Sequence, residues 1–175
     1  MLSLNLAKIR TAEERFEREY QPDALGREND DYTIVSPVSL AFDIHKDKQK
    51  FRLVGGVKTT LEMPCSRCLE PFTVDVDASF DLRYQPLAEQ THSAGEHEVK
   101  ADDVDAAFYE NDEIDLGQLM EEQFLLSLPM KPLCSDDCKG LCATCGTNLN
   151  KAACNCTTQW EDPRLAALKA LKKES

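Results

Sequence analysis

The chain has 175 residues, of which 42% are hydrophobic and 30% are charged, and its formal net charge is −12. This composition is typical of a soluble globular protein of about one domain and argues against a disordered chain. The sequence lacks both an apolar run of the roughly 18–20 residues that a membrane-spanning helix needs and the features of a secretory signal peptide, so we expect a cytoplasmic protein without a membrane partner.

The charge is distributed unevenly. Residues 131–175 contain seven Lys and Arg against five Asp and Glu, a net charge of +2, which leaves −14 for the first 130 residues. An acidic body repels phosphate groups and can attract a basic protein. A solvated surface that only aids solubility explains the same acidic excess equally well.

The N-terminal residues predict two short elements. A first strand is indicated by alternating apolar residues, at Leu2, Leu4 and Leu6. Thr11 followed by Glu14 matches a capping box, which predicts a helix from about Thr11 to Tyr20. The polar residues 21–30 are expected to form a loop.

The middle of the chain has the clearest pattern, three consecutive runs in which apolar and polar residues alternate. The apolar positions are Val38, Leu40, Phe42 and Ile44, then Phe51, Leu53, Val57, Leu61 and Met63, and finally Phe72, Val74, Val76, Ala78, Phe80, Leu82 and Tyr84. A period of two predicts three antiparallel strands with one apolar face. We expect Gly55 and Gly56 to mark a bulge or a sharp bend.

An acidic stretch then runs over residues 96–122, with eleven acids against the single Lys100. It is interrupted by AAFYE at residues 106–110, which predicts a short strand.

A helix is predicted over residues 115–128, where Asp115 is the N-cap, Gln118 completes a capping box and Pro129 ends the helix. Its apolar stripe is expected to cover the open face of the sheet, through Leu116, Leu119, Met120, Phe124 and Leu128. A short basic helix is predicted from about Pro163.

Together these elements predict an α+β fold. It consists of a twisted antiparallel β-sheet of three long strands plus short ones, covered by a helix and followed by a cysteine-rich zinc-binding segment. We divide the chain into an α+β core over residues 1–130, which includes the acidic stretch, and a module over residues 131–175 that contains the cysteines and the basic helix.

The eight cysteines are the strongest chemical signal. They form C-x2-C at Cys65 and Cys68, C-x3-C-x3-C-x2-C from Cys134 to Cys145, and C-x-C at Cys154 and Cys156. A C-x2-C turn lets two thiolates converge on one ion, and Zn²⁺ takes four thiolates in a tetrahedron. Disulfides are disfavoured in a reducing cytosol, and thioredoxin-like pairs need a βαβ setting that this pattern does not show. Redox-controlled release of zinc stays open as an alternative.

These thiols predict one or two structural zinc ions. Two closed sites would use all eight, and our partition places Cys65, Cys68, Cys134 and Cys138 in one site and Cys142, Cys145, Cys154 and Cys156 in the other. A closed four-thiolate site has no open coordination position for catalysis.

Other catalytic groups are not evident in the sequence. His45, His92 and His97 are expected to be exposed side chains rather than catalytic bases, and the common nucleotide-binding and hydrolase motifs are missing. We therefore expect that the protein is not an enzyme and has no small-molecule substrate.

Three segments together resemble the YceD-like family of large ribosomal RNA subunit accumulation proteins. They are CSRCLEPF at residues 65–72, EIDLGQLMEEQFLLSLPMKPLC at residues 113–134 and CKGLCATCGTNLN at residues 138–150. The resemblance runs from about Leu40 to the C-terminus, and its most recognisable motif is Cys65, Arg67 and Cys68. It implies a non-enzymatic accessory role in large ribosomal subunit biogenesis and large-subunit rRNA accumulation.

Such a role allows two kinds of partner. The acidic stretch could shield a basic ribosomal protein, or basic residues could contact the large-subunit rRNA precursor. The candidate contact residues are Arg67, Lys139, Lys151, Arg164, Lys169, Lys172 and Lys173. Arg67 also suits compensation of the thiolate charge, and the last lysines also suit the dipole of the C-terminal helix. The alternative function is a zinc-thiolate redox-sensing or chaperone-type regulatory protein.

Overall fold

The computed structural model describes residues 2–25, 31–87 and 106–156. It divides the chain into two compact units: unit 1 comprises Met1–Pro64 and Pro71–Pro132, and unit 2 comprises Cys65–Glu70 and Leu133–Ser175. From the sequence we expected a single boundary between the two parts, near residue 130. In the structure, Cys65–Glu70 also belongs to the cysteine-rich unit, although it lies between two strands of the sheet.

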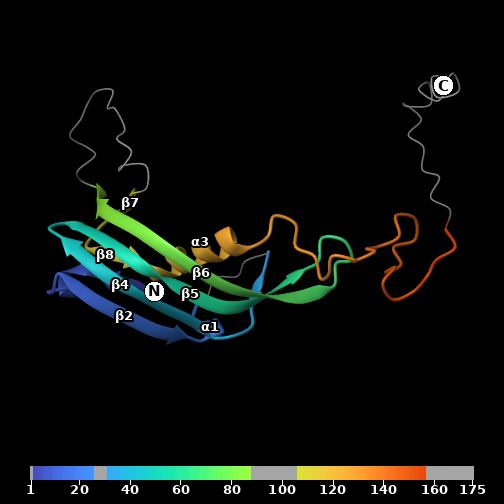
Figure 1. Cartoon of the computed structure of the whole chain (residues 1–175), viewed down its shortest axis with the longest axis horizontal. Coiled ribbons are helices and arrows are strands. Elements are labelled where there is room, and N and C mark those ends of the chain that lie inside the picture. Colours follow the sequence, from blue (N-terminus) through green and yellow to red (C-terminus); the bar gives the residue numbers. More distant parts are fainter. Residues whose placement is uncertain (1, 26–30, 88–105, 157–175) are drawn as a thin grey trace, which may run out of the picture. The chain divides into compact units, whose positions relative to one another are not determined.

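Unit 1 is built on a six-stranded sheet (Figure 1). Its strands are β2 (Glu13–Tyr20), β3 (Thr33–Ile34), β4 (Val38–Asp47), β5 (Lys50–Pro64), β6 (Pro71–Pro86) and β7 (Ala106–Tyr109). The spatial order is β2-β4-β5-β6-β7, and β3 pairs with the second half of β5. The three long predicted strands and the short strand after residue 105 are confirmed. The expectation of a wholly antiparallel sheet is wrong, because β6 and β7 pair in parallel.

The segment predicted as a helix from Thr11 to Tyr20 is a strand, and that prediction is wrong. All eight residues of β2 pair antiparallel with β4. Phe16 and Tyr20 are four residues apart, a spacing that puts two side chains on one face of a helix and also on one face of a strand. Tertiary packing selects the strand, where the Phe16 ring stacks on Phe42 with centroids 4.8 Å apart.

Strand β5 runs through Gly55 and Gly56 without the bulge that the sequence suggested. Its pairing with β4 and β6 is continuous on both sides of the glycines. A Cβ atom on Gly55 would collide with the β4 backbone at Ala41 and Phe42. The glycine is therefore required because two strand backbones approach closely there.

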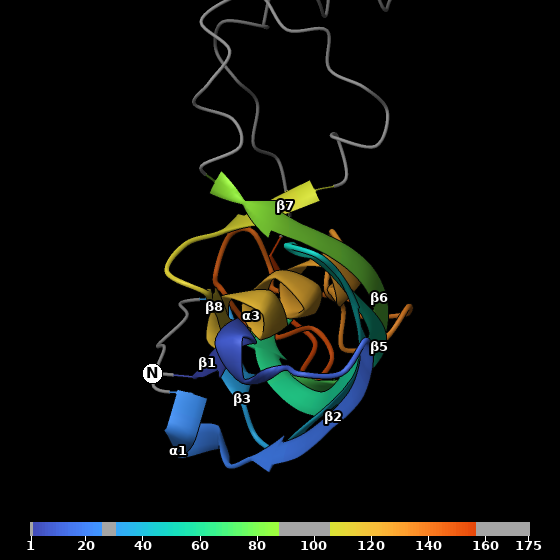
Figure 2. The ribbon, with the colours of Figure 1, turned by 90° about the vertical axis from the view of Figure 1, so that its left-hand side faces the viewer.

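Figure 2 shows the sheet curving around α3 (Leu116–Ser127), which covers its concave face. The predicted N-cap is confirmed, since Asp115 Oδ1 accepts the Gln118 amide at 3.0 Å. The Gln118 side chain donates to Glu122 at 2.9 Å, and its part in a capping box stays a prediction. The helix contributes its predicted stripe to the core, with Leu116, Leu119, Met120 and Phe124 buried and Leu128 partly buried.

The remaining elements are short. Strand β1 (Ser3–Asn5), where a first strand was predicted, pairs with β8 (Glu113–Asp115), which leads directly into α3. A 3-10 helix, η1, covers Leu6–Lys8, and α1 (Pro22–Leu25) lies within the segment expected to be a loop. In the described part of the chain, no helix is long and apolar enough to cross a membrane.

Candidate metal centres

Unit 2 gathers the eight thiols into two groups of four. Group 1 consists of Cys65, Cys68, Cys134 and Cys138, and group 2 of Cys142, Cys145, Cys154 and Cys156. Within each group all sulfur atoms lie within 4.8 Å of one another, and all eight cysteines are free thiols. These are the two sets expected from the sequence, and each could hold a metal ion.

Group 1 has the dimensions of a tetrahedral thiolate site. The Cys65 and Cys138 sulfurs are 3.8 Å apart, and the Cys68 and Cys134 sulfurs are 3.7 Å apart. Four thiolates at about 2.3 Å from a Zn²⁺ ion lie roughly 3.8 Å from one another. Disulfide sulfurs would be at about 2.05 Å, so the geometry fits a metal ion.

The two C-x2-C segments fold into the same turn. In each turn, the amide two residues after the first cysteine donates to that cysteine's Sγ at 3.5 Å. The amide four residues after it donates to its carbonyl oxygen at 2.9 Å. These amides belong to Arg67 and Leu69 in the first turn and to Thr144 and Gly146 in the second. Backbone donors thus orient a sulfur in each group before any metal binds.

Arg67 connects the first turn to the following cysteine segment. Its guanidinium donates to the carbonyl oxygens of Asp136 at 3.2 Å and Cys138 at 2.8 Å. Its own carbonyl accepts the Leu141 amide at 3.1 Å. The structure therefore engages Arg67 with backbone carbonyl groups next to group 1, where sequence analysis considered charge compensation or a phosphate contact.

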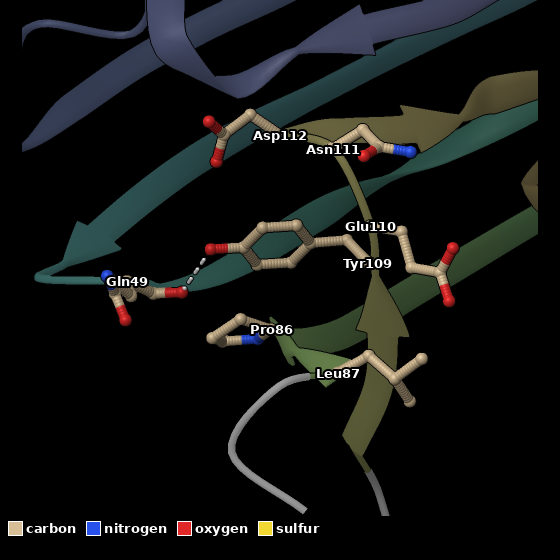
Figure 3. A pocket seen from close by; sticks show the side chains of 7 residues that line it. All are labelled: Gln49, Pro86, Leu87, Tyr109, Glu110, Asn111 and Asp112. Carbon is tan, nitrogen blue, oxygen red and sulfur yellow. Dashed lines mark hydrogen bonds between the residues drawn. The ribbon is translucent and has the colours of Figure 1, made fainter. Parts of the chain in front are cut away.

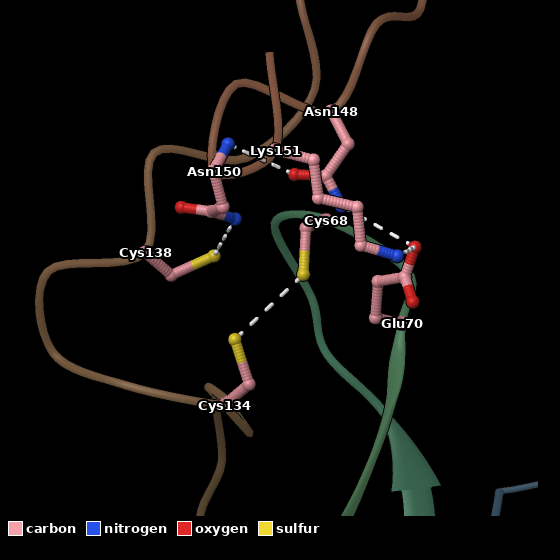
Figure 4. A network of polar contacts seen from close by, with 7 residues as sticks. All are labelled: Cys68, Glu70, Cys134, Cys138, Asn148, Asn150 and Lys151. Carbon is pink, nitrogen blue, oxygen red and sulfur yellow. Dashed lines mark hydrogen bonds and ion pairs between the residues drawn. The ribbon is translucent and has the colours of Figure 1, made fainter.

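A polar network joins the loop between Cys145 and Cys154 of group 2 to group 1 (Figure 4). Asn150 Nδ2 donates to the Cys138 sulfur at 3.3 Å, and the Asn150 amide donates to Asn148 Oδ1 at 3.0 Å. Glu70 accepts from Lys151 at 2.7 Å and from Asn148 at 3.3 Å. The hydrogen bond from Lys151, more than its charge, holds the pKa of Glu70 below its usual range. Lys151, which the sequence suggested as a partner contact, thus forms an ion pair with Glu70 of the same chain.

The thiols of group 1 differ in proton affinity. Burial raises the pKa of Cys65, but hydrogen bonds from the Cys68, Arg67 and Cys134 amides outweigh it and lower the value to about 6. A hydrogen bond with the Cys138 sulfur, together with burial, raises the pKa of Cys134 to about 12. The metal-free group therefore retains protons at neutral pH, and a divalent ion would displace them.

Group 2 follows the same pattern. The Thr147 hydroxyl, 3.1 Å from the Cys145 sulfur, is the main cause that lowers the pKa of Cys145 to about 6. The hydrogen bond with Cys145 raises the pKa of Cys156 to about 12. Each group thus pairs a readily formed thiolate with a thiol that keeps its proton until metal replaces it.

The residues that support the thiols from outside the C-x2-C turns were not predicted from the sequence. These are Glu70, Thr147, Asn148 and Asn150, and the only available signal was the polar TNLN run that follows Cys145 and Gly146. Of the other predicted contacts, Lys139 is exposed and its amide donates to Asn150 Oδ1 at 2.8 Å. The predictions for His92, His97, Arg164, Lys169, Lys172, Lys173 and the helix from Pro163 lie outside the described residues.

His45 is partly exposed, as expected, and its Nδ1 lies 3.4 Å from a Glu13 carboxylate oxygen. A cavity of about 530 Å³ lies beside the turn that follows β7. Figure 3 shows the Tyr109 hydroxyl donating across it to the Gln49 carbonyl, at 2.8 Å. The other lining residues are Pro86, Leu87, Glu110, Asn111 and Asp112, a set without a cation, a histidine or a thiol.

Residues 53–172 match the family described as large ribosomal RNA subunit accumulation protein YceD. The chain is 28% identical over 164 residues to the chloroplastic large ribosomal RNA subunit accumulation protein YCED homolog 1 of Arabidopsis thaliana, covering 82% of this chain and 51% of the relative. The Zea mays homolog 1 is 27% identical over 143 residues, which are 69% of this chain and 49% of the relative. The YceD protein of Haemophilus influenzae is 27% identical over 105 residues, 59% of this chain and 58% of the relative.

The chain thus spans about half the length of these curated relatives. No solved structure matches it. The family match extends over both units and over more than half of the sequence. The chain therefore belongs to the YceD family of large ribosomal RNA subunit accumulation proteins.

Proposed function

We propose that the protein is a non-enzymatic accessory factor in large ribosomal subunit biogenesis, which binds a ribosomal protein or the large-subunit rRNA precursor. The Arabidopsis and Haemophilus relatives are named for large ribosomal RNA subunit accumulation. In this proposal both thiol groups hold structural Zn²⁺, and no small molecule is transformed. We retain the cytoplasm as the compartment, although the two plant relatives are named as chloroplastic.

The construction of unit 2 carries the proposal. Among its described residues, the buried apolar side chains are all cysteines, namely Cys65, Cys68, Cys138 and Cys142. A unit of this kind needs metal in place of a hydrophobic core. Closed four-thiolate sites supply structure and leave no position for a substrate, which suits a binding module.

The outward face of the sheet supports a binding role. Its exposed or partly exposed side chains alternate with more buried ones along β4, β5 and β6. Acids predominate around the second half of β5, at Glu19, Glu62, Asp75 and Asp77, whereas its first half carries the cations Lys50, Arg52 and Arg83 among Asp43, Asp47 and Asp81. The acidic end suits a basic protein and the cationic end suits phosphate groups.

A zinc-thiolate redox or chaperone-type regulator is the second candidate. Cys134 of group 1 and Cys145 and Cys156 of group 2 are exposed, so a small oxidant could reach each group. Oxidation of two thiolates to a disulfide would remove two ligands and release the metal.

Ribosomal RNA levels test the first candidate. In cells that lack the gene, we expect the ratio of large-subunit to small-subunit rRNA to fall, and the intact chain to restore it. The double variant Cys65→Ser/Cys68→Ser, which removes two ligands of group 1, should fail to restore it. An unchanged ratio in the deletion strain would contradict the proposal, and client binding that begins only after mild peroxide treatment would favour the regulator.

A further inference from the structure

A second cavity in unit 1 has a lining unlike the rest of this acidic chain. It measures about 400 Å³ and lies where the turn from β4 to β5 meets the end of β6. Four cations line it, Lys46, Lys50, Arg52 and Arg83, against the single carboxylate of Asp47. The lining residues therefore have a formal charge of +3, and the Asp81 carboxylate, which accepts from both Nε and Nη2 of Arg52, lowers the charge at the cavity to +2 in a chain whose net charge is −12.

Neighbouring groups hold two of these cations in place. Lys46 Nζ donates to the Ile9 carbonyl at 2.9 Å and lies 5.5 Å from the centre of the Phe51 ring. Arg52 Nε donates to Asp81 Oδ1 at 2.7 Å. Both contacts keep the cations at the cavity without removing all of their donors, because an ammonium has three N–H groups and a guanidinium has five.

The positive field extends across the cavity to the neighbouring strand. The Arg52 hydrogen bond is the main cause that holds the pKa of Asp81 below its usual range, and the charges of Arg52, Arg83 and His45 add to it. The lining side chains of Lys50, Arg52 and Arg83 are exposed, so a ligand can reach them from solvent.

Phe51 and Tyr84 also line the cavity, but both side chains are buried in the core, on the face of the sheet opposite to Arg52 and Arg83. The exposed cations therefore determine the ligand, and they suit a phosphate group, which pairs with Arg and Lys. A cavity of about 400 Å³ falls within the range that holds small ligands and has room for one nucleotide.

We propose that this cavity binds the phosphate backbone of a single-stranded segment of large-subunit rRNA, with one nucleotide entering it. The inference rests on the proposed function and selects RNA from its two partner classes. Single-stranded RNA suits the cavity because its bases are unstacked and its phosphates are accessible to side chains. The acids around the second half of β5 repel RNA from the other end of the sheet.

The test is the affinity of the full, zinc-loaded chain for a labelled single-stranded fragment of large-subunit rRNA, measured by fluorescence anisotropy over a series of salt concentrations. Three phosphate contacts predict a slope of log affinity against log salt of about −2. The variant Lys50→Gln/Arg83→Gln should lower the slope to about −0.7 and weaken binding roughly 25-fold at 0.1 M salt. The conservative variant Lys50→Arg/Arg83→Lys should retain most of the affinity.

Lys58→Gln is the matched control. Lys58 lies on the same outward face, is exposed and pairs with Asp77 at 2.8 Å, so its loss removes a charge without touching the cavity. Its RNA affinity should stay within about twofold of the unsubstituted chain. All variants should keep the same metal content and thermal unfolding temperature.

Three results would overturn the inference. They are an unchanged affinity and slope in Lys50→Gln/Arg83→Gln, an equal loss in Lys58→Gln, or binding of poly-glutamate as tight as that of RNA. The rRNA ratio in cells reports separately on the proposed function. A Lys50→Gln/Arg83→Gln chain that fully restores that ratio would leave the accessory role standing and refute RNA binding at this cavity.

Discussion

The two C-x2-C turns carry different residues directly after their second cysteine, which allows a direct test of how backbone conformation supports the metal centres. The residue after the second cysteine is left-handed in both turns, with φ of 60° at Leu69 and 72° at Gly146. A side chain in this conformation costs about 1 kcal/mol relative to glycine. Leu69 recovers little of that cost through burial, because 64% of its surface is exposed.

We therefore expect opposite effects from two substitutions. Gly146→Ala should destabilise the second turn by about 1 kcal/mol, because its new Cβ meets nothing within 4 Å and only the conformational cost applies. Leu69→Gly should stabilise the first turn by about the same amount. Gly140→Ala should cost more, since φ there is 74° and a Cβ would lie 2.9 Å from the Arg67 carbonyl oxygen.

The assay is competition for Zn²⁺ with a chromophoric chelator, because the folding free energy of a metal-dependent unit appears in its metal affinity. A change of about 1 kcal/mol corresponds to roughly a fivefold change in affinity. Leu69→Ala, which keeps the strained backbone and removes only the exposed side chain, is the control and should match the unsubstituted chain. Weaker zinc binding by Leu69→Gly would refute the reasoning and show that the leucine side chain supports the turn.

Three further predictions concern unit 1. Gly55→Ala should lower the free energy of unfolding, measured in urea, by roughly 2–3 kcal/mol, because the new Cβ collides with the β4 backbone. Gly56→Ala is the comparison, since its Cβ would lie 2.8 Å from the Ala78 carbonyl oxygen. An effect of Gly55→Ala no larger than that of Gly56→Ala would argue against the close approach of β4 and β5. Asp115→Ala should lower the free energy of unfolding by about 1 kcal/mol through loss of the helix cap, and Gln118→Ala should lower it less. Equal losses would indicate that the Gln118 side chain also caps the helix. Burial raises the pKa of Tyr84 from 10 to about 12. The unfolded chain therefore loses this proton at lower pH than the folded chain, and the free energy of unfolding should fall between pH 10 and pH 12. Tyr84→Phe should show a shallower fall, and a pH profile identical to that of the unsubstituted chain would contradict this prediction.

Alternation of apolar residues identifies β4, β5 and β6 because each carries four or more apolar side chains that point to the same face of the sheet. Strand β2 lies at the edge of the sheet and pairs only with β4, so two rings at Phe16 and Tyr20 suffice for its packing. Such a sparse pattern fits a helix as well as a strand, and the partner strand that decides between them follows later in the chain. The parallel pairing of β7 also depends on a neighbour distant in sequence and leaves no local signal.

Cysteine spacing predicts the candidate metal centres because ligands of one ion must lie in short turns that bring sulfurs together. The supporting contacts of Glu70 and Asn150 cannot be predicted in the same way, because the sequence pattern around them is that of polar residues in any loop. The cationic cavity is equally hidden, because its side chains come from Lys46 to Arg52 and from Arg83, on different strands of an acidic chain. Only the register of the sheet brings them to one end.

The central claim is that two separate thiolate groups hold metal and order unit 2. Native mass spectrometry of the chain purified under reducing conditions tests it most directly, with Cys65→Ser/Cys68→Ser compared with Cys142→Ser/Cys145→Ser. The account predicts two Zn²⁺ ions in the unsubstituted chain and the loss of one ion in each double variant. One ion that is indifferent to Cys65→Ser/Cys68→Ser, or no metal at all, would contradict it.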